Sequence, residues 1–198
     1  MAQVSADLNS YLEELRACRI CAGQMQRYPN PIVRAAPGAR ILIASQAPGN
    51  LADRSSKPFA DPSGVRLRDW MGVSEDEFYD ESRIVIAPMG FCFPGYDKNG
   101  GDLPPMKVCA PTWRAGLLER LPDLELVLAI GGYAQKWHLG QAASKTLTET
   151  VRNWRTHLEP GILPTPHPSW RNNAWLKKNP WFETDILPVL RQKVRDLL

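Results

Sequence analysis

The feature that most constrains the fold is a series of short apolar runs separated by helical patterns. The runs occupy residues 40–44 (RILIA), 83–87 (RIVIA) and 124–130 (LELVLAI), with a weaker fourth run at 161–163. Helical patterns lie between them, at residues 64–71, 110–121 and 133–139. Apolar strands that alternate with helices are typical of a parallel sheet covered on both faces. The sequence therefore predicts an α/β fold, a three-layer α/β/α domain whose central sheet has about four mostly parallel strands.

Two more helices are expected near the ends of the chain. Leucines at helical spacing predict an amphipathic helix over residues 8–18, which would deliver the first cysteines. Near the other end, Asn179 is expected to cap a helix whose first residue is Pro180. Pro188 falls inside the same pattern, and we expect it to kink that helix because proline lacks a backbone N–H.

The length of the chain favours one globular unit. With 198 residues, of which 43% are hydrophobic, the chain is long enough for one ordinary core and too short for two. We therefore expect a single domain over residues 1–198. The first residues lack a basic segment followed by an apolar block, and the apolar runs are too short to span a bilayer. These features predict a cytoplasmic protein with no membrane partner, and no obligate protein partner is evident.

Charge by itself does not indicate a partner, because the formal net charge is only +3. Its distribution is more informative, since cations outnumber anions between residues 145 and 178. These cations are Lys145, Arg152, Arg155, Arg171, Lys177 and Lys178. A basic segment of this kind either faces phosphates or is solvated surface, and the sequence leaves both interpretations open.

The cysteines suggest a metal centre. There are four of them, Cys18 and Cys21 separated by two residues, and Cys92 and Cys109 on either side of a loop. In a reducing compartment such grouping favours metal ligation over disulfides. A structural zinc site commonly repeats its Cys-x2-Cys pair, whereas the second pair here is separated by 16 residues. The spacing favours a [4Fe-4S] cluster, with zinc as the alternative.

Three unusual peptides follow the expected strands. They are SQAPG at residues 45–49, MGFC at 89–92 and PHPS at 166–169. In open α/β sheets, ligands bind in the loops beyond the carboxyl ends of the strands. These peptides are therefore expected to form a ligand site together.

The same peptides carry a resemblance to a known family. SQAPG at 45–49 resembles motif A of the uracil-DNA glycosylases, and Asp53 and Phe59 keep the spacing of the iron-sulfur group, family 4. His167-Pro168-Ser169 resembles motif B, and Gly131-x2-Ala134 with Leu139-Gly140 resembles the segment between the motifs. The four cysteines fall where the cluster ligands of that group fall. The resemblance implies a DNA repair glycosylase that hydrolyses the N-glycosidic bond of uracil or another deaminated base in DNA.

The sequence departs from the family pattern at three positions. Family 4 members usually have glutamate at the position of Gln46, and family 1 enzymes have an acid at the position of Ala47. Where family 4 has an asparagine that reads the pyrimidine edge, this chain has Pro88. These departures leave the target base and the catalytic rate open.

The resemblance also assigns roles to individual residues. A base must leave the stack to be reached, and Phe59 is the ring expected to stack on it. His167 is expected to donate a hydrogen bond to the base as negative charge develops there. Asp53 is expected to orient the water or support the sugar, although helix capping or an ion pair would also explain it. Gln46 is a further candidate for holding the water, but an amide cannot accept its proton.

Binding residues are implied in two groups. Those for the substrate are Gln46, Ala47, Pro48, Gly49 and Phe59, and those for DNA are Gly49, Ser169, Trp170, Arg171 and Asn172. Simple packing is the competing interpretation for Trp170, since the chain has 7 tryptophans.

The missing carboxylates motivate a second function, a protein that binds uracil or abasic DNA on the same scaffold with little or no turnover. A zinc enzyme of unrelated chemistry is a third.

Overall fold

The structure, a computed structural model, describes residues 2–198. Its centre is one sheet of four parallel strands in the order β2-β1-β3-β4. The strands are β1 (Ile41–Ala44), β2 (Ile84–Ile86), β3 (Leu126–Ile130) and β4 (Ile162–Thr165). Each coincides with one of the four apolar runs. The predicted α/β class with a parallel sheet is therefore confirmed.

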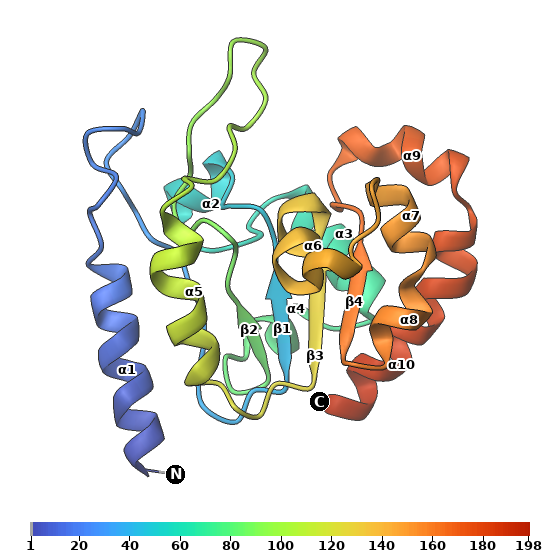
Figure 1. The fold of residues 1–198 in the computed structure, drawn as a ribbon, viewed down its shortest axis with the longest axis horizontal. Coiled ribbons are helices and arrows are strands. Elements are labelled where there is room, and N and C mark those ends of the chain that lie inside the picture. The colour runs from blue at the N-terminus through green and yellow to red at the C-terminus, as the bar shows by residue number, and fades with distance from the viewer. Residues whose placement is uncertain (1) are drawn as a thin grey trace.

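The helices lie between the strands and at both ends of the chain (Figure 1). In the first half they are α1 (Ala2–Arg16), α2 (Asn50–Ser55), α3 (Pro62–Met71), α4 (Glu75–Tyr79) and α5 (Cys109–Glu119). In the second half they are α6 (Gly131–Leu139), α7 (Leu147–Arg152), α8 (Trp154–Leu158), α9 (Asn173–Lys178) and α10 (Leu187–Leu197). The helices that the sequence did not predict are α2, α4, α7, α8 and α9. Each spans fewer than two full turns, which is too short for a clear apolar period.

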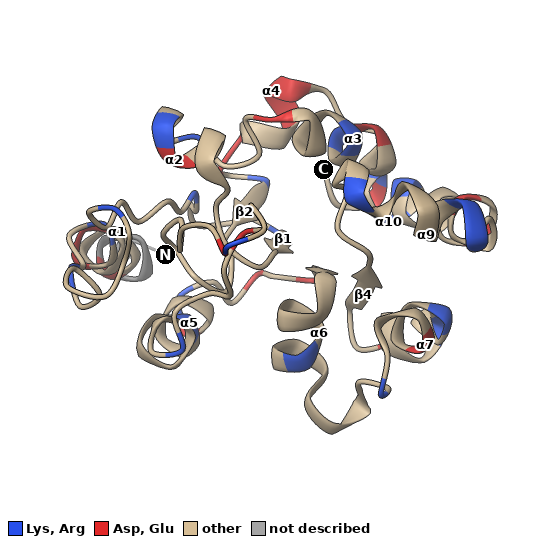
Figure 2. Ribbon diagram, turned by 90° about the horizontal axis from the view of Figure 1, so that it is seen from above, with Lys and Arg blue, Asp and Glu red and all other residues tan. Residues whose placement is uncertain are grey.

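Alternate strand residues face opposite layers, as the two-residue period of a strand requires. Ile41 and Ile43 pack in the apolar cluster that contains Trp70 of α3 and Leu190 of α10. Leu42 lies in the other cluster, with residues of α1 and α5. Seen from above, α1, α5 and α6 lie on one side of the sheet, and α3, α4 and α10 on the other (Figure 2). The three-layer arrangement follows from strands that are apolar on both faces.

The C-terminal segment differs from its prediction. Asn179 ends α9, and its side chain donates to the carbonyl oxygen of Trp175 at 2.9 Å and does not cap the next helical segment. That segment begins at Trp181, one residue after the predicted start. A π-helical turn, Phe182–Ile186, precedes α10, so Pro188 lies in the first turn of α10. A first-turn position tolerates proline because its N–H would have no helical partner there. The change of helix type therefore accommodates Pro188 between two helical segments.

The other end also differs in detail. Helix α1 ends at Arg16, so Cys18 lies beyond the helix and not within it. The Tyr11 hydroxyl donates to the carbonyl oxygen of Trp113 at 2.7 Å and thereby attaches α1 to α5. Among residues 2–198, no helix is both long enough and apolar enough to cross a bilayer.

Candidate active site at the carboxyl edge of the sheet

A cavity of about 60 Å³ lies beyond the carboxyl ends of β1, β2 and β4. Its wall includes Ala47, Pro48 and Gly49 after β1, Pro88 after β2, and His167 after β4. We call this space the inner cavity. It forms where it does because the carboxyl ends of parallel strands meet at one edge of the sheet. The structure thus brings two of the peptides that the sequence singled out, SQAPG and PHPS, to one place, whereas Gly90, Phe91 and Cys92 of the third line the cysteine pocket instead.

Phe59 forms one side of the inner cavity in an unusual backbone conformation. Its φ is 55°, in the left-handed region that costs a non-glycine residue about 1–3 kcal/mol. Two features hold it there. The Tyr79 hydroxyl donates to the carbonyl oxygen of Pro58 at 2.8 Å. The Phe59 carbonyl lies so close to Gly64 that a Cβ on Gly64 would meet its oxygen at 1.9 Å.

His167 faces Phe59 across the cavity. The two ring centroids are 6.5 Å apart and the ring planes differ by 26°, so the rings are nearly parallel. The backbone N–H of Ser169 lies 3.2 Å from Nδ1 of His167. Because Nδ1 accepts this hydrogen bond, the neutral imidazole carries its proton on Nε2.

The surroundings of His167 keep it neutral. Burial lowers the pKa of the imidazole below its ordinary value, and the opposing attraction of Asp61 is the weaker effect. The backbone is fixed as well, by prolines at 166 and 168 and by Asn172, whose side chain donates to the His167 carbonyl oxygen at 2.7 Å. The site therefore presents a positioned, neutral N–H donor.

Gln46 borders a wider space outside the inner cavity, not the inner cavity itself. Its Nε2 donates to the carbonyl oxygen of Leu103 at 3.2 Å. The backbone carbonyl of Gln46 accepts from the N–H of Gly90 at 2.9 Å, which ties the end of β1 to the end of β2. The amide side chain thus holds the loop that contains Leu103.

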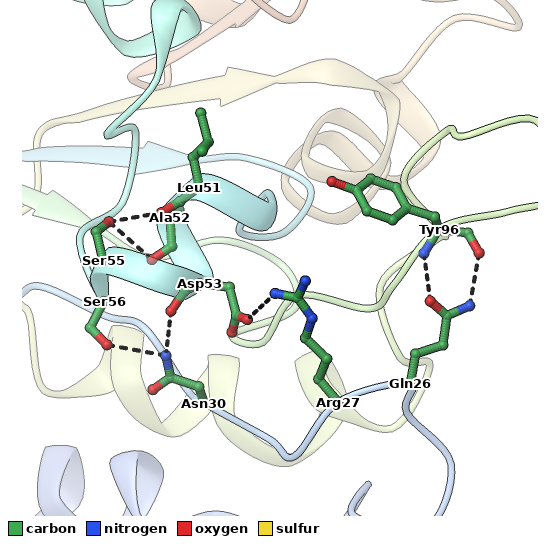
Figure 3. A network of polar contacts seen from close by, with 9 residues as sticks. All are labelled: Gln26, Arg27, Asn30, Leu51, Ala52, Asp53, Ser55, Ser56 and Tyr96. Carbon is green, nitrogen blue, oxygen red and sulfur yellow. Dashed lines mark hydrogen bonds and ion pairs between the residues drawn. The ribbon is translucent and has the colours of Figure 1, made fainter.

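Asp53 does not line the inner cavity. Its side chain points toward Arg27 instead (Figure 3). Helix α2 turns its carboxylate toward Arg27, and the Oδ2 to Nη1 distance is 3.1 Å. The side chain of Asn30 donates to the backbone carbonyl of the same residue at 3.0 Å. The geometry matches the ion-pair interpretation and gives no support to a role for Asp53 in orienting water.

Two other carboxylates border the inner cavity, Asp61 and Asp102, and the sequence reasoning missed both. Asp61 caps α3, accepting from the N–H of Gly64 at 3.1 Å and from the Ser63 hydroxyl at 2.5 Å. Asp102 follows two glycines in the loop between the third and fourth cysteines. The sequence feature that could have identified Asp61 is its place before Pro62 at the start of a helical pattern. For Asp102, the only such feature is the pair of glycines that precedes it.

An outer groove of about 550 Å³ continues from the inner cavity. Its wall includes Asn50, Arg66, Tyr96, Trp170 and Arg171. Trp170 is 70% exposed, so it is not a packing residue. Ser169 lies on the same wall, and Asn172 borders the space between the groove and motif A. The DNA-binding residues implied by motif B therefore lie together beside the cavity.

The predicted basic segment does not form one face. Of its six cations, only Arg171 lines the outer groove. Arg152 lies over the ring of Trp181, and Arg155 over that of Trp154. Lysines and arginines are spread over helices of both layers (Figure 2). Arg66 of α3, which the sequence analysis did not single out, is the second arginine of the groove.

The four cysteines line a separate, mostly apolar pocket between the end of α1 and the start of α5. All four thiols are free. The N–H of Phe91 donates to Sγ of Cys109 at 3.4 Å, and the backbone of Asn30 hydrogen-bonds to Cys92. Among the described residues, no three His, Cys, Asp or Glu side chains converge as ligands of a single metal ion.

The chemistry of this pocket fits a cationic group shared by the four sulfurs. Burial, with a smaller contribution from neighbouring thiols, raises the pKa of the Cys92 thiol to about 12 and that of Cys109 to about 11. Four thiolates are therefore unfavourable here unless a bound positive charge offsets them. The N–H groups directed at sulfur would stabilise thiolate ligands in the same way.

Comparison with known proteins shows the family to which the chain belongs. The family model of the uracil DNA glycosylase superfamily matches residues 33–191, which include both motifs and the second cysteine pair but neither Cys18 nor Cys21. Among solved structures, the chain is similar to a candidate uracil DNA glycosylase from Methanosarcina acetivorans, determined by solution NMR. The two are 17% identical with a TM-score of 0.47, and the alignment covers 82% of this chain and 97% of the other. Because the family match spans most of the chain, this protein belongs to the uracil DNA glycosylase superfamily.

Proposed function

We propose that this protein is a DNA glycosylase that hydrolyses the N-glycosidic bond of uracil or another deaminated base. The observation that carries the proposal is the pair of nearly parallel rings, Phe59 and His167, on the wall of one cavity. A flipped base needs a flat aromatic surface on which to stack. It also needs a positioned N–H donor that stabilises the negative charge developing on the base as the bond breaks.

The neutral state of His167 suits cleavage of this bond. When the bond between C1′ and the base nitrogen breaks, negative charge accumulates on the base and positive charge on the sugar. The Nε2–H of His167 would donate to the base, and that hydrogen bond strengthens as the anion develops. The lowered pKa of the imidazole keeps the ring in the required form at neutral pH.

The outer groove is the proposed path of the DNA strand. Arg66 and Arg171 supply positive charge, and the exposed indole of Trp170 supplies an apolar surface beside the flipped base. Backbone N–H groups near Gly49 and the polar side chains of Ser169 and Asn172 would hold phosphates. Most of the affinity would then be electrostatic and would fall with salt.

Several deaminated bases are compatible with the inner cavity. Pro88 borders it where the resemblance would place an asparagine, and proline offers no N–H donor. No Asn or Gln side chain appears on its described wall. We therefore propose that base recognition rests on His167, on backbone groups and on the shape of the slot.

We further propose that Cys18, Cys21, Cys92 and Cys109 hold a [4Fe-4S] cluster. The four cysteines line one pocket, and the 16 residues between Cys92 and Cys109 do not repeat the Cys-x2-Cys pair that is common in structural zinc sites. When bound, the cluster would supply a covalent tie between the end of α1 and the loop after β2. Zinc remains the alternative, and iron and sulfide analysis of the purified protein separates the two.

A second candidate function is recognition of uracil or abasic DNA without turnover. The absence of a carboxylate at Gln46 and Ala47 favours it, because motif A then offers no group to accept a proton from water.

Excision and binding measured on the same oligonucleotides distinguish the two functions. We would assay a panel that contains uracil, hypoxanthine, xanthine or no damaged base, at one salt concentration. Release of a base under single-turnover conditions supports the glycosylase. Tight, damage-specific binding with no release from any member of the panel supports the binding protein instead.

A further inference from the structure

We propose that Asp102 supplies the carboxylate that motif A lacks, and that it accepts the proton of the attacking water. This inference rests on the proposed glycosylase function and adds a catalytic residue to it. Asp102 borders the inner cavity, the outer groove and the space between them, and His167 borders all three as well. Asp61 borders two of these spaces, and Asp53 borders none.

The loop that carries Asp102 extends beyond the carboxyl edge of the sheet, between β2 and α5 (Figure 1). It is braced internally by Asp97. The Oδ1 of Asp97 accepts from the N–H groups of Asn99 and Gly101, each at 2.8 Å. The backbone of Leu103 closes the loop by donating to the carbonyl oxygen of Gly95 at 2.9 Å. These hydrogen bonds give the loop a defined conformation.

Both family motifs hold this loop, one on each side of Asp102. Gln46 of motif A donates to the carbonyl oxygen of Leu103 at 3.2 Å. Arg171, which follows motif B, donates to the carbonyl oxygen of Gly100 at 3.0 Å. The residue in motif A that has lost its carboxylate thus helps to place a carboxylate from elsewhere in the chain.

Of the two carboxylates that border the inner cavity, Asp102 is the one whose oxygens are available to accept a proton. Within residues 7–198, its side chain makes no hydrogen bond and no ion pair, whereas Asp61 is engaged by Ser63 and Gly64. The residue stays accessible to solvent, so water can reach it. Partial burial of the carboxyl raises its pKa above the ordinary value, Asp61 and Asp97 raise it further, and Arg171 opposes them. A raised pKa makes the carboxylate a better base.

The bond between C1′ and the base nitrogen breaks, and its electron pair leaves on the base, where the Nε2–H of His167 stabilises the charge. The oxygen of a water molecule forms a bond to C1′. A proton from that water passes to the Asp102 carboxylate, and the departed base later takes up a proton from solvent. No oxidant, reductant or further reactant is required.

The test compares Asp102→Asn with three matched variants. Asp61→Asn alters the other carboxylate of the cavity, Asp97→Asn loosens the loop, and Asp123→Asn changes an exposed aspartate far from the loop. Single-turnover excision and binding are measured on the oligonucleotide that wild type cleaves best. We expect Asp102→Asn to lose about 10²-fold or more in excision rate with unchanged binding. Asp61→Asn should lose less, and Asp123→Asn should match wild type.

Two readouts separate a catalytic carboxylate from a structural one. Wild-type excision should fall as the pH drops through the raised pKa of Asp102, and Asp102→Asn should lack that part of the profile. His167, Asp61 and Arg171 border the outer groove with Asp102, and Asp97 lies in the same loop. All four remain in the variant, so the difference between the two pH profiles reports the loss of Asp102. In Asp102→Ala, added formate should restore part of the excision rate, because a small carboxylate can occupy the vacated position. Formate should not restore His167→Ala.

Three results would overturn the inference. Excision by Asp102→Asn close to that of an active wild type would mean that another group activates the water, while the glycosylase function stands. Equal loss of binding and excision would make Asp102 a structural residue. A wild type inactive on every base of the panel would remove the proposed function, and the assignment of Asp102 with it.

Discussion

The inner cavity and the cysteine pocket are built in different ways. Around the cavity, the sheet edge, two prolines and hydrogen bonds from Tyr79, Ser169 and Asn172 hold Phe59 and His167. Around the cysteines, the segments after α1 and after β2 have little regular structure. The first region is held by contacts within the chain, whereas the second would depend on the proposed cluster. Stability and chemistry should therefore respond to different substitutions.

One loop belongs to both regions and couples them. It begins at Cys92, carries Asp102 at the cavity and returns to the pocket at Cys109. Gln26, in the segment after the first cysteine pair, donates to the Tyr96 carbonyl oxygen at 2.8 Å and accepts from its N–H at 3.0 Å (Figure 3). The cysteine pocket is therefore joined to the inner cavity through the placement of this loop.

The largest effect is expected from Cys109→Ala. Loss of one of four ligands would expose the cluster and release the loop, giving colourless, poorly folded protein with reduced excision. Iron and sulfide content, visible absorption and thermal unfolding measure the outcome. Met106→Leu, which alters the same pocket without removing a thiol, is the control. Iron-replete wild type that contains neither iron nor sulfide would contradict the prediction.

His167→Ala should separate the two regions cleanly. We expect the fold, the iron content and DNA binding to stay near wild type while the excision rate falls by about 10²-fold or more, because the lost donor acts on the developing base anion. His157→Gln is the matched control, since that side chain lies on α8 away from the cavity. Loss of iron and activity together in His167→Ala would show that the cysteine pocket depends on His167 as well.

Gly64→Ala tests how the cavity wall is held. The added Cβ would meet the carbonyl oxygen of Phe59 at 1.9 Å, so the backbone at Phe59 must shift. We expect a loss of about 1–3 kcal/mol in unfolding free energy and a higher KM as the stacking ring moves. Gly132→Ala, where a Cβ would have no neighbour within 4 Å, is the control. An unchanged KM would show that Phe59 does not contact the base.

The smallest effect is expected from Asp53→Asn. The carboxylate pairs with Arg27 outside the cavity, so excision should stay near wild type and stability should change by less than about 1 kcal/mol. Single-turnover rates and denaturant unfolding measure both quantities, with Asp123→Asn alongside. A loss of excision comparable to that of His167→Ala would restore Asp53 as the residue that orients water.

The sheet and the edge that bears the site were predictable because they depend on local patterns of apolar residues and short motifs. Apolar runs located all four strands, and the position of SQAPG and PHPS after two of them located the site edge. The motif residues His167 and Phe59 do meet at one cavity. The short helices escaped prediction, as did the π-helical turn before α10, because each depends on packing more than on sequence period.

The sequence by itself determined the parallel sheet, the family and the residues available at the sheet edge, since strand periodicity and short motifs act over a few neighbouring positions. Only the tertiary structure decided which carboxylates face the cavity. The helical phase of α2 turns Asp53 toward Arg27, and a loop folded back onto Gln46 and Arg171 brings Asp102 to the cavity in its place. These contacts join residues 26 to 71 positions apart, and no local pattern encodes them.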